Sequence, residues 1–355
     1  GNGITDPYIS GNGCTPAKAE LVWQDAMNLV TDIKYNADSN GGNISFKVDR
    51  SSIRQGNAVI AIKDVSDAIL WSWHVWVTDE DINNVIEITN HQNVKYNFMP
   101  VNLGQCDGNT ITYEERSCKV KFIAGDQSKE ITIKQLANVI ATGSNAPFYQ
   151  WGRKDPLYPS NGMGNTTKIW YDKEGIPSTA NPMKGTFSAG NDCIKNCILN
   201  PNLMHNRYNG DYTYYNLWSA DNKTTSANDN PVNKTIYDPC PVGFKLPASN
   251  AFTGFTTTGE SVSSSTQVNG TWSSSEKGWY FYTNSEKTQS IFFPALGYRS
   301  YSTMRPGSIG TQGCFWSAHP VAKGNNYYLR TSSVDVQPTY MVDRGFGYAL
   351  RPCQD

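Results

Sequence analysis

The stretch NAVIAIKDVSDAILWSWHVWVTD, residues 57–79, contains two apolar runs separated by a short polar turn. Both runs are rich in Val, Ile or Trp, as strands are. In the second run Ser72 and His74 fall on one face, while Trp71 and Trp73 fall on the other. We expect this run to be covered on both faces, because its tryptophans would be costly to leave in water. The stretch therefore predicts two neighbouring antiparallel strands.

Strand patterns continue on both sides of this stretch. The runs ELVWQDA, NLVTDIKYNA and NISFKVDR precede it, with turn-forming segments such as DSNGG between them. Together these runs predict a β meander. Strand patterns return from residue 270, whereas residues 140–235 read as long polar loops with embedded aromatics. We predict an α+β fold that is mostly antiparallel β, with short helices and long loops.

The segment TIYDPCPVGFKLP, residues 235–247, predicts a rigid approach to a short helix. Pro239 and Pro241 restrict the backbone on both sides of Cys240, and Gly243 permits an unusual φ. The following residues, LPASNAFTGF, are expected to form a helix. Its apolar side would carry Phe252 and Phe255, and Ser249 or Asn250 would cap it.

Charge and length limit the classes of function. The chain has 355 residues and a formal net charge of −1, and it contains no basic run, so binding to nucleic acid or to anionic lipid is disfavoured. No stretch reaches 18 consecutive apolar residues, so no membrane-spanning helix is predicted. We expect residues 1–19 to be a polar linker and 20–355 to form one large domain, in which 20–66 is a candidate separable β unit.

Eight cysteines in a chain with few charged residues are typical of a protein from an oxidising compartment. Cys106 and Cys118 flank a strand-like stretch whose fold-back would bring them together. Cys193 and Cys197 are four residues apart, so on a helix they share one face, as in a metal pair or a strained disulfide. We predict no metal, because a zinc site needs further ligands and the histidines are scattered singly. Those histidines are His74, His91, His205 and His319.

Several longer motifs resemble one known group of proteins. They are residues 58–79, NAPFYQWGRKDP (145–156), YDPCPVGFKLP (237–247), FFPALGYRS (292–300), GCFWSAHPVAKGNNYYLR (313–330) and RGFGYALRPC (344–353). In this order they resemble Bacteroidetes surface proteins, namely the Fibrobacter major paralogous domain and fimbrillin-like adhesins, over residues 20–355. The closing motifs also resemble the C-type-lectin-like fold in its formylglycine-generating-enzyme branch. The resemblance implies an exported protein at the outer membrane or in a fimbrium, with a lipid anchor outside this chain.

The lectin-like resemblance bears on catalysis and on metals. Formylglycine-generating enzymes use two late redox cysteines, and here Cys314 and Cys353 are 39 residues apart. Cys353 more closely matches the structural cysteine that closes such domains, and the resemblance implies Cys240 as its disulfide partner. Calcium-dependent lectins carry an acidic motif that is missing here, where the nearest stretch is Gln337–Thr339. We therefore expect neither an enzyme nor a cofactor.

Aromatic residues in the long loops are the candidate ligand site. Tyr and Trp stack on sugar rings while Asn and Asp bond their hydroxyls, so NGDYTYYNLWSADN, residues 209–222, has the composition of a glycan-binding loop. The alternative is that these aromatics anchor the loops to the core. The candidates are Tyr212, Tyr214, Tyr215 and Trp218, followed by Trp170 and Tyr171.

We predict a non-catalytic cell-surface or fimbrial adhesin that binds a host or environmental ligand, with a glycan as the candidate, and that contacts other fimbrial subunits. Three alternatives stay open: a carbohydrate-capture lipoprotein, a divergent formylglycine-generating-type oxidase, and a structural pilus subunit. A lectin requires an exposed aromatic patch, and an oxidase requires two close thiols in a cleft. A structural subunit requires an unpaired edge strand or an exchangeable terminal segment.

Overall fold

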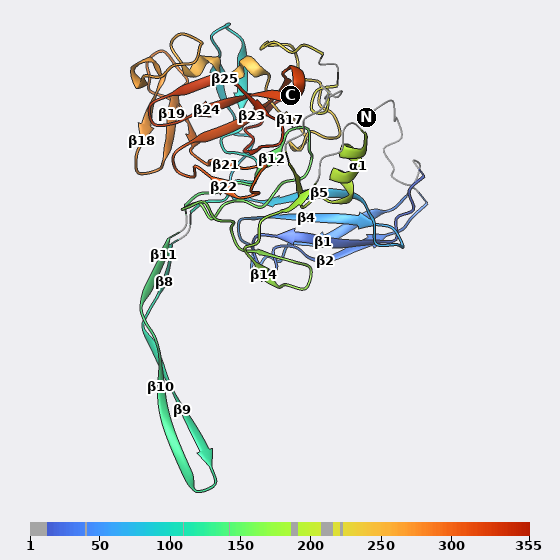
Figure 1. Cartoon of the computed structure of the whole chain (residues 1–355), viewed down its shortest axis with the longest axis vertical. Coiled ribbons are helices and arrows are strands. Elements are labelled where there is room, and N and C mark those ends of the chain that lie inside the picture. The colour runs from blue at the N-terminus through green and yellow to red at the C-terminus, as the bar shows by residue number, and fades with distance from the viewer. Residues whose placement is uncertain are drawn as a thin grey trace.

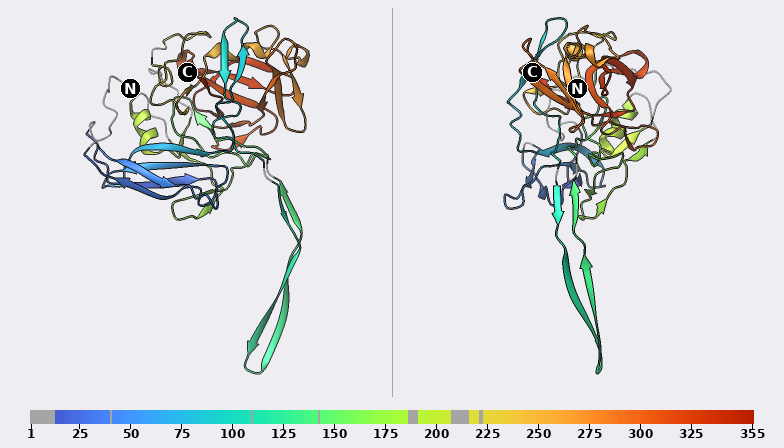
Figure 2. Two further views of the ribbon diagram at one scale, coloured as in Figure 1. Left: turned by 180° about the vertical axis from the view of Figure 1, so that it is seen from behind. Right: turned by 90° about the vertical axis from the view of Figure 1, so that its left-hand side faces the viewer.

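The fold is mostly antiparallel β-structure with a few short helices, which confirms the predicted class. A computed structural model describes residues 13–39, 41–108, 110–141, 143–185, 191–206, 216–220 and 223–355 (Figure 1). These residues form three parts: an N-terminal pair of sheets, a larger body made mainly from the C-terminal half, and a long hairpin that projects away from both (Figure 2). No helix among the described residues is long and apolar enough to cross a membrane.

The N-terminal part contains two layers of strands. The larger layer has the order β14-β13-β1-β4-β5, and the smaller is the hairpin β2-β3. The bounds are β1 (Lys18–Gln24), β2 (Thr31–Asn36), β3 (Asn43–Lys47), β4 (Gly56–Lys63), β5 (Ile69–Val77), β13 (Trp170–Tyr171) and β14 (Pro177–Ser178). Leu21, Leu29 and Ile60 are among the buried residues of the core between the layers.

The five expected strands exist, but the predicted meander is wrong. β1 pairs with β4 rather than with β2, and β2 pairs only with β3 in a separate layer. β4 lies between β1 and β5, and seven of its eight residues are buried, because sheet neighbours lie on both sides of it and side chains cover both of its faces. The boundary at residue 66 falls in the turn between the paired strands β4 and β5.

The body is built from several small antiparallel sheets around two hydrophobic cores. One sheet contains β17 (Phe244–Lys245), β27 (Cys353–Gln354), β7 (Lys95–Phe98) and β6 (Ile86–Thr89). A second contains β12 (Tyr149–Gln150), β26 (Gly347–Tyr348), β21 (Tyr298–Arg299) and β22 (Pro306–Gly307). Two three-stranded sheets contain β18 (Gly270–Ser273), β19 (Gly278–Tyr282) and β20 (Ser290–Pro294), and β23 (Gly313–Pro320), β24 (Asn325–Thr331) and β25 (Val336–Asp343).

Short helices join these sheets. The segment predicted to be helical after residue 247 forms a 3-10 helix, η2 (Ser249–Phe255), and both Phe252 and Phe255 are fully buried. Ser249 does not cap it; its hydroxyl instead hydrogen-bonds the Asn228 carbonyl at 3.1 Å. The other short helices are α1 (Asn191–Leu199), η3 (Ser265–Gln267) and η4 (Ala322–Gly324), and α1 precedes β16 (Leu203–His205), which pairs in parallel with β15 (Met183–Gly185).

The projecting hairpin comprises β8 (Thr110–Tyr113), β9 (Arg116–Ala124), β10 (Gln127–Gln135) and β11 (Asn138–Ala141). We call residues 110–141 the arm. β9 pairs with β10 over nine residues, and β8 pairs with β11 nearer the body. At its root, Cys106 and Asn145 exchange backbone hydrogen bonds of 2.8 and 3.0 Å. The arm therefore leaves the body as a two-stranded ribbon, and no strand among the described residues lies beside it (Figure 1).

Candidate functional site

The predicted aromatic loop does not provide an open stacking surface at Trp218. Its side chain is 0% exposed, packs against Trp151 at 5.3 Å between ring centroids, and donates its indole N–H to the carbonyls of Arg153 and Tyr237. Trp218 therefore anchors the loop to the core, and its assignment as a ligand-stacking residue is corrected. Tyr212, Tyr214 and Tyr215 lie outside the described residues.

Trp170 and Tyr171 lie on the short strand β13 at one side of the N-terminal sheet. The Trp170 ring stacks on Tyr158, with 4.4 Å between centroids and 9° between planes, and its indole N–H donates to the Ala180 carbonyl at 3.0 Å. Because one face of this ring is already covered, only its other face is left for a ligand. Tyr171 is half-buried and pairs with Gln24 of β1.

None of the eight cysteines, all of which lie in described residues, forms a disulfide in the structure. The predicted approach of Cys106 to Cys118 is wrong, because the hairpin turns later in the chain. Cys118 lies opposite Ile133 in the arm, whereas Cys106 stays buried at the root of the arm. Cys240, in the loop before β17, and Cys353, in β27, are both buried free thiols, and burial raises the pKa of Cys353 to about 12.

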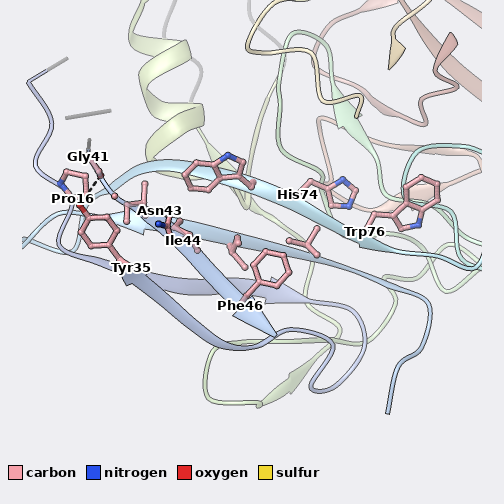
Figure 3. Close-up of a pocket in the computed structure, with 13 residues that line it drawn as sticks. Pro16, Tyr35, Gly41, Asn43, Ile44, Phe46, His74 and Trp76 are labelled. Atoms are coloured by element: carbon pink, nitrogen blue, oxygen red, sulfur yellow. Dashed lines mark hydrogen bonds between the residues drawn. The ribbon is translucent and has the colours of Figure 1, made fainter. Parts of the chain in front are cut away.

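A groove of about 650 Å³ opens between the β2-β3 hairpin and the face of β4 and β5 (Figure 3). Tyr35, Ile44 and Phe46 line it from the hairpin, and Ile60, Trp73 and Val75 line it from the sheet. Trp73 is 40% exposed, so the expectation that β5 is covered on both faces is wrong at this residue. The β2-β3 hairpin therefore leaves part of this apolar surface in contact with solvent.

Two strand edges border this groove. β5 ends the five-stranded sheet and β3 ends the two-stranded sheet, so neither has a further strand beside it among the described residues. An open edge presents unpaired backbone N–H and C=O groups and can accept an added strand. The groove thus combines apolar side chains at its floor with strand edges at its borders, although on β5 the Ser72 carbonyl already accepts from Lys154 Nζ at 2.9 Å.

The arm carries a complementary surface. On one face of the β9–β10 ribbon, Val120 lies opposite Ile131 and Cys118 opposite Ile133, with Phe122 one pair further out. Phe122 is 57% exposed and Ile133 52% exposed, and no other described part of the chain covers them. The opposite face is polar apart from Ile123. The alternation in RSCKVKFIA was a signal for this amphipathic ribbon that our sequence reading missed.

Buried polar contacts hold the grooved sheet against the body. Asn57 of β4 donates its side-chain amide to Asp25 at 3.0 Å and to the Gly104 carbonyl at 2.9 Å. The Asn57 amide oxygen therefore accepts from His74 Nε2 at 2.9 Å, and His74 Nδ1 accepts from the Tyr149 hydroxyl at 3.0 Å. These bonds specify a neutral imidazole, and burial lowers the pKa of His74 to about 4. We assign this network a structural role, because the hydrogen-bonding groups of its side chains are paired with one another.

A buried ion pair adds to this junction. Lys154 Nζ lies 2.8 Å from Asp155, and Asp155 in turn accepts from the Ser72 hydroxyl of β5 at 2.7 Å. The Lys154 ammonium also sits 4.4 Å from the centroid of the Trp71 ring. Removing one member would leave a buried charge without its partner, so the pair ties the orientation of β5 to the body.

The comparisons with known proteins give no identification. No family model, no curated protein and no solved structure matches this chain.

Proposed function

We propose that this chain is a non-catalytic, exported surface protein that assembles with other subunits of an adhesive fimbria, and that the arm of one copy docks in the groove of the next. The observation that carries the proposal is the uncovered apolar face of the arm. An isolated two-stranded ribbon is at best marginally stable in water, and a ribbon with Phe122, Ile131 and Ile133 exposed gains stability when a partner covers that face.

The chemistry of the groove suits the arm as its occupant. The groove offers a nine-residue edge strand, β5, and the arm offers two nine-residue strands whose apolar side chains share one face, namely Cys118, Val120 and Phe122 on β9 and Ile131 and Ile133 on β10. Charge adds little to this pairing, because the arm, residues 110–141, contains five basic and four acidic residues, a net charge of +1, and the rest of the chain carries −2.

The geometry of such a contact favours a linear assembly. Arm and groove are different surfaces of one chain, so their contact is heterologous and leaves a free arm at one end and a free groove at the other. Repetition gives a filament unless the rotation closes a ring. This arrangement agrees with the fimbrial role implied by the sequence resemblance, and it requires no catalytic chemistry.

The first test measures assembly by light scattering on a size-exclusion column as a function of concentration. We expect wild-type chains to associate and the Phe122→Lys/Ile131→Lys variant to stay monomeric, because both changes place charge on the apolar face. Ile123→Lys is the matched control on the opposite face of the same ribbon and should associate like wild type. A wild-type chain that stays monomeric at high concentration, or equal loss in the control, contradicts the proposal.

A second test locates the contact by cross-linking. Cys118 is exposed on the apolar face of the arm, so in a Phe46→Cys variant the thiol introduced in the groove should form intermolecular disulfides with Cys118 under mild oxidation. Val242→Cys, at a residue that is 99% exposed on the body, is the matched control and should not cross-link. Cross-links between two copies of Cys118 would instead indicate arm-to-arm pairing and would contradict docking in the groove.

Glycan capture is the second candidate function, and one observation favours it. The rings of Trp73 and Phe46 are both more than a third exposed in the groove and could stack on a sugar ring. A glycan array would test it, with Trp73→Ala expected to abolish binding and Val65→Ala, in an exposed turn, expected to preserve it. Absence of glycan binding by a folded wild-type chain would remove this candidate.

A further inference from the structure

We propose that Cys193, Cys197 and His205 form a binding site for one thiophilic metal ion, with Zn²⁺ as the best match. Their ligand atoms, two Sγ and one imidazole nitrogen, all lie within 4.8 Å of one another. The structure thus brings one histidine close to two cysteines, whereas the sequence predicted that the histidines are scattered singly. The proposal concerns a different region from the arm and the groove and does not depend on them.

The local sequence explains how the three ligands meet. Cys193 and Cys197 lie one helical turn apart on α1, so both side chains project from the same face. The chain then reverses through a turn in which the Leu203 amide donates to the Asn200 carbonyl at 3.1 Å. β16 follows at once and returns His205 to the cysteine face of the helix. The ligand pattern is Cys-x3-Cys-x7-His.

His205 is held in place independently of any ion. Its backbone N–H donates to the Gln150 side-chain oxygen at 3.0 Å, and its carbonyl accepts from the Gln150 side-chain amide at 2.8 Å. The residue is buried, and β16 also pairs with β15. A ligand whose backbone is fixed on both sides loses little further freedom when an ion binds, which favours affinity.

The electrostatics of the site favour thiolate. The Arg153 guanidinium is tied to the backbone carbonyls of Leu203, Pro201 and Asn200, the latter two at 2.9 and 3.3 Å. A hydrogen bond from Cys193 and the nearby Arg153 charge lower the pKa of Cys197, while the same hydrogen bond raises the pKa of Cys193. Zn²⁺ would bind both cysteines as thiolates, so its binding would release their protons.

The donor set selects the metal. Two sulfurs and one imidazole are preferred by Zn²⁺ over Ca²⁺ or Mg²⁺, which take oxygen ligands. Tetrahedral Zn²⁺ with Zn–S of about 2.3 Å and Zn–N of about 2.0 Å separates its ligand atoms by roughly 3.5–4 Å. The observed limit of 4.8 Å is within a small side-chain rotation of that value. Three protein ligands leave a fourth position for water or an external ligand.

The test is a metal measurement on the full chain, purified under reducing conditions and supplied with Zn²⁺ before exhaustive dialysis. We expect about one Zn²⁺ per chain by mass spectrometry of the metal, and loss of at least 10-fold in affinity in Cys193→Ser, Cys197→Ser and His205→Asn. Cys118→Ser is the matched control, since this thiol lies on the arm, and it should keep the ion. Co²⁺ should give the intense visible bands of tetrahedral thiolate coordination in wild type and in this control only.

Folding and redox state are measured in parallel. Circular dichroism of each variant identifies a chain that has lost metal by unfolding, and Co²⁺ spectra of the folded conservative variants then decide the result. A reduced, folded wild-type chain that binds no Zn²⁺ overturns the proposal. A Cys193–Cys197 disulfide that forms in air equally fast with and without Zn²⁺ also overturns it, because that result identifies a redox pair instead.

Discussion

Acidification should destabilise this protein through His319, a residue of β23 whose side chain is 0% exposed. Its Nδ1 accepts the backbone N–H of Ser249 at 3.3 Å, so this nitrogen carries no proton in the folded state. A proton on Nδ1 would face that N–H and break the link between β23 and η2. Burial accordingly lowers the pKa of His319 from 6.5 to about 4.

The size and sign of the effect follow from this pKa difference. Below pH 6.5 the His319 imidazole takes up a proton in the unfolded chain, but in the folded chain it does so only near pH 4. The contribution of His319 to the free energy of unfolding is therefore complete at neutral pH and is lost as the pH falls from 6.5 to 4. The free energy of unfolding should fall by about 2 kcal/mol between pH 7 and pH 5 from His319 alone, and by about 3 kcal/mol by pH 4. His74, whose pKa is also about 4, adds a loss of the same sign and similar size. The raised pKa of buried Asp238 acts in the opposite direction.

The assay is urea unfolding at pH 7, 6 and 5 for wild type, His319→Gln and His91→Gln. The His319→Gln variant should show a shallower loss with pH, while His91→Gln changes an exposed ring and should follow wild type. If His319→Gln does not fold, an NMR titration of the wild-type histidine ring protons replaces it, and the His319 ring should remain neutral at pH 5, as should that of His74. A wild-type unfolding free energy that does not change between pH 7 and pH 5, or a His319 ring that titrates near pH 6.5, would refute the reasoning.

Three further predictions concern packing. Gly104→Ala should lower the free energy of unfolding by about 2–4 kcal/mol, because φ is +76° and a Cβ would lie 2.5 Å from Pro147 Cγ and 2.6 Å from Asn57 Oδ1. An unchanged urea midpoint would contradict this prediction. Trp218→Ala should lower the free energy of unfolding by about 3–5 kcal/mol, whereas Trp73→Ala, at a half-exposed residue, should lower it by about 1 kcal/mol or less. Similar losses in the two variants would indicate that Trp218 does not anchor its loop to the core. Replacement of residues 110–141 by a short Gly/Ser linker should leave the thermal midpoint of the body within about 2 °C, because the arm folds away from it; a larger drop by calorimetry would show that the arm supports the body.

Local patterns predicted the elements better than their pairing. The strands β1 to β5 and the helix with Phe252 and Phe255 lie where periodicity and proline placement indicated. The pairing of β1 with β4 was missed, because alternation specifies which side chains share a face and not which strand lies beside which. The arm was missed for another reason. Its residues show clear alternation, but a sequence reading assigns an apolar face to the core, and here that face points to solvent.

For the candidate sites, too, the sequence shows local spacing but not contacts between distant segments. The i, i+4 spacing of Cys193 and Cys197 is visible in the sequence, but the approach of His205 depends on a turn and on a strand held by Gln150. Likewise the groove depends on the absence of a further strand between β3 and β5 in the described part of the chain, and no single residue encodes that absence.

By itself, then, the sequence determined the β-rich class, the positions of most N-terminal strands and the low charge that disfavours nucleic acid, because these depend on composition and short-range periodicity. The tertiary structure alone decided that Trp218 is buried, that Trp73 and the arm are exposed, and that two thiols meet an imidazole. The physical reason is that exposure and ligand distances depend on contacts between segments far apart in the chain, and those contacts are set by the packing of whole layers rather than by any local run of residues.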